Sequence, residues 1–290
     1  MYTIGFFDGV HLGHRDLLRQ LRSAAAERGL TPHVVTFKEH PALSLGREVP
    51  LLLTPVAEKR RLLEEEGVEV TVLSFTPEMA ALTASDFMAF LQKEYGMKAL
   101  LMGYNHRFGR HAEKDADYAA WGRALGVEVL RATEFTVEGD GEQVSSSRIR
   151  QALEEGDLSR ANRLLGHPFT LTGMVVEGRQ VGRDLGFPTA NLRPSHPRQQ
   201  LPSVGVYACN AVLSDGSKWK AAVNIGSRPT LNNGEDISIE AHLPQYFGDL
   251  YGQFVRLEFL EFLRPERQFE SLEALKIQLA ADVRHITQNL

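Results

Sequence analysis

The first half of the sequence alternates short β-type runs with helix-type runs, and this alternation restricts the fold more than any other feature. The β-type runs cover residues 2–7, 33–37, 68–75, 97–102 and 127–130, and the helix-type runs cover 16–25, 54–67, 86–95 and 115–125. Several helix-type runs begin with a capping residue followed by proline, as at Thr54-Pro55, or end at glycine. Strands separated by helices at this spacing predict a parallel sheet covered on both faces.

From about residue 169 the pattern changes to β-type runs without long helices between them. These runs cover residues 170–176, 206–213, 219–225, 237–243 and 254–263. Two short helices, at 147–155 and 158–165, precede them, and a helix from 272 to about 288, capped by Ser271, follows them. Mostly antiparallel strands with one terminal helix predict a small barrel or sandwich. We place the domain boundary between residues 165 and 166, which gives domains 1–165 and 166–290.

Composition limits the classes of function. The chain has 290 residues and a formal net charge of −5, which argues against broad binding to nucleic acid or to a membrane surface. Its one cysteine, Cys209, excludes an intramolecular disulfide framework and a cysteine-rich metal site, and is expected in the core. No apolar run approaches a membrane span and no signal peptide precedes the first strand, so a cytoplasmic location is expected.

The stretch FFDGVHLGH, residues 6–14, lies between the first β-type run and the first helix. A turn at this place points unpaired N–H groups and the positive end of the helix dipole at its occupant, usually an anion. Gly9 and Gly13 would let the backbone approach that anion, and His11 and His14 could both face it as hydrogen-bond donors. A nucleotide phosphate is the expected ligand. The alternative is a glycine-rich turn whose histidines only cap the helix.

Four motifs, in order, resemble those of the bacterial bifunctional riboflavin kinase and FMN adenylyltransferase (FAD synthetase) family. They are GFFDGVHLGH at 5–14, GYNHRFG at 103–109, VSSSRIR at 144–150 and GRDLGFPTAN at 182–191, and the likeness continues through EAHL at 240–243, LYG at 250–252 and LRPE at 263–266. The resemblance implies a Rossmann-like nucleotidyltransferase domain followed by a riboflavin kinase barrel. It also implies two reactions: ATP phosphorylates riboflavin to FMN, and a second ATP then transfers AMP to FMN, giving FAD and pyrophosphate. In this family some residues usually precede the first strand, whereas Met1 here begins almost inside it, as in a trimmed chain or a late start.

In the first domain the resemblance implies catalytic roles for His11, His14 and Arg150, which would stabilise charge on the α-phosphate and the departing pyrophosphate. The implied nucleotide-binding residues are Phe7, Asp8, Gly9, Gly13, Ser146 and Ser147. Taken alone, residues 145–150 have the pattern of a helix cap followed by a solvated charge.

Asn105 in the second motif is an implied contact of FMN or ATP, and we assign it to the flavin. The family commonly carries an acidic residue and an aromatic one where this chain has Tyr104 and His106. A solvated loop turn is therefore the alternative interpretation of Asn105.

In the second domain the resemblance implies that Glu240 is the catalytic base for the ribityl hydroxyl. From periodicity alone Glu240 would be an outward-facing glutamate on a strand. Thr189 and Asn191 offer hard oxygen ligands suited to Mg²⁺. The implied nucleotide contacts here are Gly182, Arg183 and Gly186, in a glycine-rich segment suited to a flap over phosphates, and the implied flavin contacts are Asn224, Arg228 and Arg264.

Two other classes of function remain open on the sequence. A different nucleotidyltransferase, such as a tRNA-charging enzyme, would need a tRNA-binding region, which this short acidic chain lacks. A non-enzymatic flavin sensor would keep the pockets without turnover, and the presence of His11, His14 and Glu240 argues against it. The expected partners are riboflavin, FMN and ATP with Mg²⁺, without nucleic acid or membrane, and the oligomeric state stays open.

Overall fold

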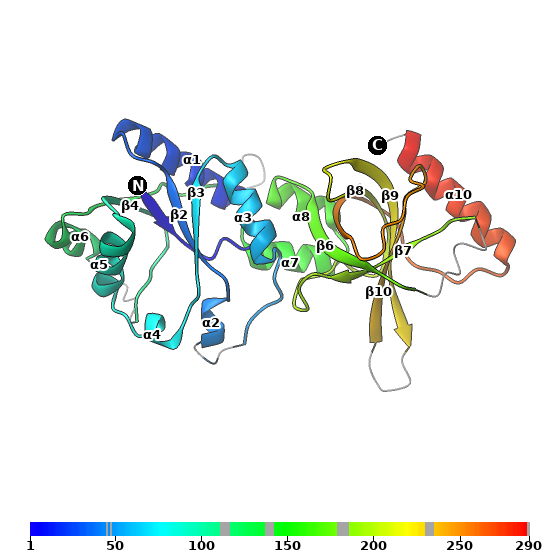
Figure 1. The fold of residues 1–290 in the computed structure, drawn as a ribbon, viewed down its shortest axis with the longest axis horizontal. Coiled ribbons are helices and arrows are strands. Elements are labelled where there is room, and N and C mark those ends of the chain that lie inside the picture. Colours follow the sequence, from blue (N-terminus) through cyan, green and yellow to red (C-terminus); the bar gives the residue numbers. More distant parts are fainter. Residues whose placement is uncertain are drawn as a thin grey trace. The chain divides into compact units, whose positions relative to one another are not determined.

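The computed structural model describes residues 1–44, 46, 48–110, 117–136, 142–178, 186–229 and 235–288. The chain divides into two compact units, Met1–Ser145 and Ser146–Leu290, which are described separately (Figure 1). Among the described residues, no helix combines the length and the apolar character needed to cross a membrane.

The first unit is built on a five-stranded sheet in the order β3-β2-β1-β4-β5, and every neighbouring pair of strands is parallel. The strands are β1 (Tyr2–Ile4), β2 (His33–Phe37), β3 (Glu69–Leu73), β4 (Ala99–Met102) and β5 (Glu128–Arg131). The strand order reverses at β1, so the chain leaves β1 and β4 at a topological switch point, where such sheets bind ligands. The predicted parallel sheet is confirmed, and residues 5–14 leave it at this switch point.

Helices cover both faces of the sheet. Neighbouring residues of one strand point to opposite faces, so each face has apolar side chains that a helix can bury. Val34 and Val35 of β2, for example, belong to two different core clusters. The helices of this unit are α1 (Leu12–Glu27), α2 (Pro41–Ser44), α3 (Val56–Glu65), α4 (Pro77–Ala80), α5 (Ala84–Tyr95) and α6 (Tyr118–Leu125). Leucines of α1 and α3 fill the cluster that contains Val34, and apolar residues of α5 fill the one that contains Val35.

The second unit is a closed antiparallel barrel in the order β10-β7-β6-β11-β8-β9, seen nearly end-on in Figure 1. Its elements are α7 (Ser146–Glu154), α8 (Leu158–Leu165), β6 (Phe169–Val176), β7 (Ala190–Pro194), β8 (Gly205–Val212), β9 (Lys218–Pro229), β10 (Glu235–His242), β11 (Phe254–Arg264) and α10 (Leu272–Gln288). The Ser271 hydroxyl accepts a hydrogen bond from the Ala274 N–H, which confirms the predicted cap of α10. Strand β7 was not predicted.

The two short helices α7 and α8 belong to the same compact unit as the barrel. The side chain of Asn162 on α8 donates to the Phe259 carbonyl oxygen at 2.8 Å and accepts from the Phe169 N–H at 2.7 Å. These bonds tie α8 to strands β11 and β6. The compact unit therefore begins at Ser146, whereas the sequence placed the boundary at 165/166, and where the two activities divide stays a prediction.

Candidate active sites

The backbone turns sharply between β1 and α1, at the carboxyl end of the parallel sheet. Phe7, Gly9 and Val10 have positive φ angles of 55°, 86° and 41°. Glycine adopts such angles readily, but they are unfavourable for a β-branched residue such as Val10. Backbone strain persists where the surrounding structure fixes the chain, and it concentrates at ligand sites. The turn is thus held in one conformation by its neighbours.

His11 and His14 lie together at the start of α1, as the sequence predicted. His11 is the N-cap residue, and its Nδ1 accepts a hydrogen bond from the His14 N–H at 3.3 Å. The two imidazole rings stack, with centroids 3.6 Å apart and 13° between their planes. The His14 Nδ1 atom is buried and has no hydrogen-bond partner within the described part of the chain. A polar atom of this kind at a helix N-terminus is suited to a ligand.

The environment keeps His14 uncharged at neutral pH. Burial is the main cause that lowers the pKa of His14 well below its usual value. The nearby positive charges of His11 and Lys59 lower it further. A neutral imidazole offers one N–H donor and one acceptor, and so can bind a phosphate oxygen without a full charge.

The side chains of Phe7 and Asp8 point into the protein, although both were predicted to bind nucleotide. Phe7 is 3% exposed. The centroids of its ring and of the His14 ring are 5.1 Å apart, in an edge-to-face arrangement. The Asp8 carboxylate accepts hydrogen bonds from the N–H groups of Leu53 and Thr54 at 3.1 and 3.0 Å. Contact with a nucleotide at these two positions would therefore use the backbone of the turn.

Thr54 is not a helix cap, so the prediction at Thr54-Pro55 is wrong. Pro55 itself is the N-cap of α3, and no side chain caps that helix. The Thr54 hydroxyl instead accepts from the Gly9 N–H at 2.9 Å and donates to Asp8 at 3.3 Å. Tertiary hydrogen bonds to the turn thus take the place of the local cap that the sequence indicated. Gly13 lies close to the His11 ring, because a Cβ built on it would stand 3.4 Å from His11 ring atoms.

Lys59 of α3 lies directly behind the turn, and sequence reasoning missed it. Its side chain is 1% exposed, and its Nζ donates to the carbonyl oxygens of Phe6 and Phe37, both at 2.9 Å. Burial, partly offset by Asp8, lowers the pKa of Lys59 to about 8. The available signal was its spacing, because Lys59 precedes Leu62 and Leu63 by three and four residues and so shares their buried helix face.

The second motif follows β4 and therefore leaves the same edge of the sheet. Arg131 donates to the Gly103 and Tyr104 carbonyl oxygens at 3.3 and 2.9 Å and so holds this loop. Asn105 is exposed in a turn. Burial, with a smaller effect of Arg131, lowers the pKa of His106 to about 4, so this imidazole is neutral. The flavin contact of Asn105 stays a prediction.

The third motif forms the first turn of α7. Ser146, Ser147 and Arg150 stand there as predicted for a helix start, while Ile149 between them is fully buried in the second unit. Since they fall in the other compact unit, their part in a nucleotide site stays a prediction.

On the barrel, three neighbouring strands place Asn191, Glu240 and Asn224 side by side. Glu240 of β10 pairs with Asn191 of β7 on one side and with Asn224 of β9 on the other. Ile239 and Ala241, on either side of Glu240, are 2% and 1% exposed and fill the barrel core. Because side chains alternate along a strand, Glu240 and its two partners share the outer face.

Thr189 completes this polar group. Its Oγ1 lies 3.5 Å from Glu240 Oε2. Hydroxyl, amide and carboxylate oxygens are the ligands that Mg²⁺ prefers, so the residues present fit this ion.

Gly178, which precedes the glycine-rich segment, lies close to Asn191. A Cβ built on Gly178 would overlap the Asn191 side-chain amide, so a larger residue at 178 would displace that amide. Gly186 has a φ of 84° and open space around its Cα. The predicted nucleotide contacts Gly182 and Arg183 lie outside the described residues.

The three predicted flavin contacts of the barrel differ in their surroundings. Asn224 Nδ2 donates to Glu266 Oε1 at 3.2 Å, beside Glu240. Only the backbone of Arg228 is described, as part of β9. Arg264 donates two hydrogen bonds to Asp282 Oδ2 on α10, from Nε at 3.0 Å and from Nη2 at 2.8 Å. The flavin contact of Arg264 stays a prediction, and the ion pair with Asp282 argues against it because it already occupies the guanidinium group.

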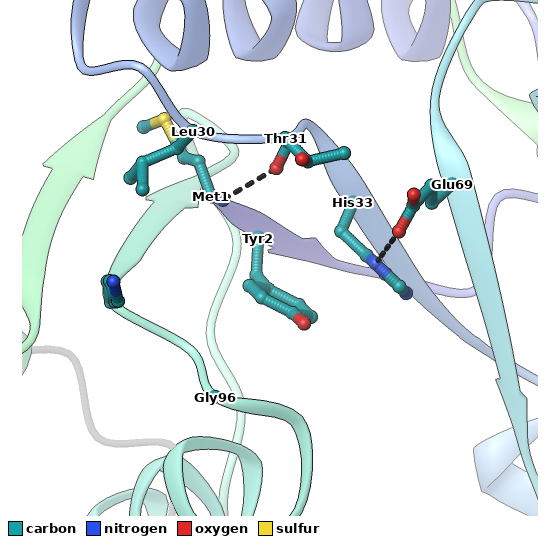
Figure 2. A pocket seen from close by; sticks show the side chains of 8 residues that line it. Met1, Tyr2, Leu30, Thr31, His33, Glu69 and Gly96 are labelled. Carbon is teal, nitrogen blue, oxygen red and sulfur yellow. Dashed lines mark hydrogen bonds and ion pairs between the residues drawn. The ribbon is translucent and has the colours of Figure 1, made fainter.

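A separate shallow pocket of about 230 Å³ lies at the opposite end of the parallel sheet (Figure 2). Tyr2, His33 and Glu69 line it, and these residues begin β1, β2 and β3. The Tyr2 and His33 rings stack 4.6 Å apart, and His33 Nδ1 lies 3.1 Å from Glu69 Oε2. The amino ends of the strands hold this pocket, whereas the histidine turn follows their carboxyl ends.

Comparisons with known proteins assign both halves of the chain. The FAD synthetase family model matches residues 1–148, and the riboflavin kinase family model matches residues 165–290. A relative from Escherichia coli K12 is 41% identical over 287 residues, covering 97% of this chain and 89% of its own length. One from Pseudomonas fluorescens is 37% identical over 286 residues, covering 97% and 90%. Both are named bifunctional riboflavin kinase/FMN adenylyltransferase.

A solved structure is similar over almost the whole chain. It has a TM-score of 0.86 and 33% identity, and covers 99% of this chain and 93% of its own. That protein is described as a macrolide-efflux protein from Streptococcus pneumoniae, a different activity from that of the relatives above. The two family models and the named relatives decide between these descriptions and confirm the resemblance seen in the motifs. The chain belongs to the family of bifunctional riboflavin kinase/FMN adenylyltransferases.

Proposed function

We propose that the two reactions of this family use the two sites described above, with adenylyl transfer at the His11–His14 turn and riboflavin phosphorylation at Glu240. One observation carries the assignment. Each family model covers one of the two polar constellations, with the histidine turn inside residues 1–148 and the Glu240 face inside residues 165–290.

In the adenylyl transfer, a phosphate oxygen of FMN attacks the α-phosphorus of ATP, and the bond to pyrophosphate breaks. Negative charge grows on the α-phosphate oxygens and on the leaving group. Preorganised donors aimed at such oxygens are often the largest contribution to catalysis. The N–H groups at the start of α1 and the rings of His11 and His14 supply donors here, and Ser146, Ser147 and Arg150 are proposed to bind the triphosphate.

In the kinase reaction, the terminal ribityl hydroxyl oxygen of riboflavin attacks the γ-phosphorus of ATP, and ADP leaves. The hydroxyl must lose its proton, and the Glu240 carboxylate on the barrel face accepts it. Thr189 and Asn191 would hold Mg²⁺ beside Glu240, where the ion would neutralise charge on the transferred phosphoryl group. Asn224 lies in register with Glu240 and is proposed to contact the flavin.

A flavin assay tests the whole assignment. The purified protein is incubated with riboflavin, ATP and Mg²⁺, and the flavins are separated by chromatography. We expect FMN and then FAD. Unchanged riboflavin with tight binding would identify a flavin sensor instead and would refute the kinase reaction, and FMN that is supplied with ATP and stays unchanged would refute the adenylyl transfer.

Variants of the histidine turn test the separation of the sites. Changing both His11 and His14 to alanine removes two donors, and the loss of one oxyanion donor typically costs about 10²–10³-fold in rate. We expect FAD formation from FMN to fall at least about 10²-fold while FMN formation from riboflavin is unchanged. Loss of both reactions in a folded variant would refute separate sites.

A further inference from the structure

The buried ammonium group of Lys59 has no role in either of the two reactions proposed above. A charged group in the interior is costly unless hydrogen bonds and charges compensate it. Lys59 donates to the Phe6 and Phe37 carbonyl oxygens, and its Nζ stands 3.9 Å from the centroid of the Phe6 ring. Phe37 is the last residue of β2, and Phe6 follows β1, so one ammonium group joins the carboxyl ends of two neighbouring strands.

We propose that Lys59 is a positioning residue for adenylyl transfer, whose ammonium group holds the His11–His14 turn in the conformation that receives the nucleotide phosphates. This inference rests on the proposed assignment of adenylyl transfer to that turn.

The hydrogen bond from Lys59 to Phe6 acts at the start of the strained turn. The Phe6 carbonyl oxygen accepts from both Lys59 and the buried Thr36 hydroxyl, at 2.9 and 3.0 Å. The very next residue, Phe7, already has a positive φ of 55°. Fixing the peptide oxygen of Phe6 therefore fixes the orientation of the peptide from which the strained turn starts.

Lys59 also acts on the turn through its field. Among the described residues, the titratable groups facing His14 are His11 and Lys59, and Asp8 faces Lys59. A positive charge behind the turn opposes protonation of His14 and favours an anion in front of it. Lys59 thus combines a geometric action on Phe6 with an electrostatic action on His14.

The test compares Lys59→Met, which removes charge and donors, with Lys59→Gln, which removes the charge but keeps an N–H donor. The matched control is Arg60→Met, because Arg60 is an exposed cation on the same helix, paired with Glu64 at 2.7 Å. We expect kcat for FAD formation to fall about 10²-fold in Lys59→Met, as misplacement of a reacting group by about 1 Å does. The fall should be smaller in Lys59→Gln and absent in Arg60→Met.

Two further readouts separate positioning from a merely structural role. Riboflavin phosphorylation by the same molecules should be unchanged, and the KM for FMN should change much less than kcat. NMR titration of the His14 ring should show its pKa raised in both Lys59 variants and unchanged in Arg60→Met.

Each remaining outcome decides the matter. If the wild-type chain forms no FAD, the proposed site fails. If the wild type forms FAD and Lys59→Met forms it equally fast, or with an unmoved His14 titration, the role of Lys59 is refuted. An N-terminal unit that unfolds in both Lys59 variants would mark the residue as structural and would overturn the proposal as well.

Discussion

Replacing Asn162 by alanine should destabilise the barrel and leave the parallel-sheet unit unaffected. The substitution removes the donor to the Phe259 carbonyl oxygen and the acceptor of the Phe169 N–H. Phe259 and Phe169 are 0% and 1% exposed, so both backbone groups would be left buried without these bonds.

The expected magnitude follows from these two groups. A buried polar group without a partner costs about 1–3 kcal/mol, and two groups give about 2–6 kcal/mol. Asn162 itself is only partly buried, so water can reach the vacated position and the lower part of this range applies. A loss of about 2–3 kcal/mol at a urea m-value of about 2 kcal/mol/M lowers the unfolding midpoint by about 1–1.5 M.

The chain offers a separate fluorescent reporter for each unit, because it has two tryptophans. Trp121 lies on α6 of the first unit. Trp219 lies on β9 of the second unit, and the centroids of its ring and of the Tyr246 ring are 5.3 Å apart. In a Trp121→Phe background, urea unfolding followed by fluorescence reports the barrel. In a Trp219→Phe background, it reports the parallel-sheet unit.

Gln151→Ala is the matched control, since Gln151 lies on α7 and its amide donates to the exposed Glu155 carboxylate at 2.8 Å. We expect it to change stability by less than about 0.5 kcal/mol. A barrel midpoint that Asn162→Ala leaves in place would refute the reasoning. So would a midpoint change confined to the parallel-sheet unit, because α8 would then belong to that unit.

Two other substitutions and a pair of fragments test the barrel and its site. Glu240→Gln should slow FMN formation about 10²–10⁴-fold, as loss of a general base does, with riboflavin binding and FAD formation from supplied FMN nearly unchanged. A fragment of residues 146–290 should be folded and phosphorylate riboflavin, and a fragment of 166–290 should unfold at lower urea concentration because it lacks α7 and α8. Arg264→Lys should lower barrel stability by about 1.5–3 kcal/mol through loss of its two-pronged contact with Asp282, while the KM for riboflavin changes little.

Each of these predictions would be contradicted by a specific result. Near-normal phosphorylation by Glu240→Gln would return Glu240 to an outward-facing strand glutamate without a catalytic role. Equal stability of the two fragments would place the boundary at 165/166, as first expected. A large rise in KM with unchanged stability in Arg264→Lys would make that residue a flavin contact.

The sequence predicted the architecture well because both halves obey simple periodicity. The parallel sheet follows from short β-type runs that alternate with helix-type runs, and the barrel follows from β-type runs that no long helix separates. Strand β7 escaped detection, because the asparagine at 191 and the proline at 194 are residue types that are depleted in strands. Pairing with β6 and β10 on both sides imposes the strand there.

The site was predicted less completely than the fold, for a physical reason. His11 and His14 belong to a dense local motif that the sequence shows, whereas the role of Glu240 comes only from the family resemblance and stays a prediction. Thr54 and Lys59 act on the turn across more than forty residues, through hydrogen bonds to Gly9 and Phe6 at 45 and 53 residues' separation. No local pattern reports such a contact.

The two units differ in whether their sheets have outer strands. The closed barrel pairs every strand with a neighbour on each side, whereas the parallel sheet ends in the two outer strands β3 and β5. Outer strands present unpaired backbone groups that can recruit a strand from another molecule, and charged side chains oppose this. Glu69 begins β3, while Glu128 and Arg131 stand at the two ends of β5. Resistance to aggregation should therefore depend on a few charges in the parallel-sheet unit and on topology itself in the barrel.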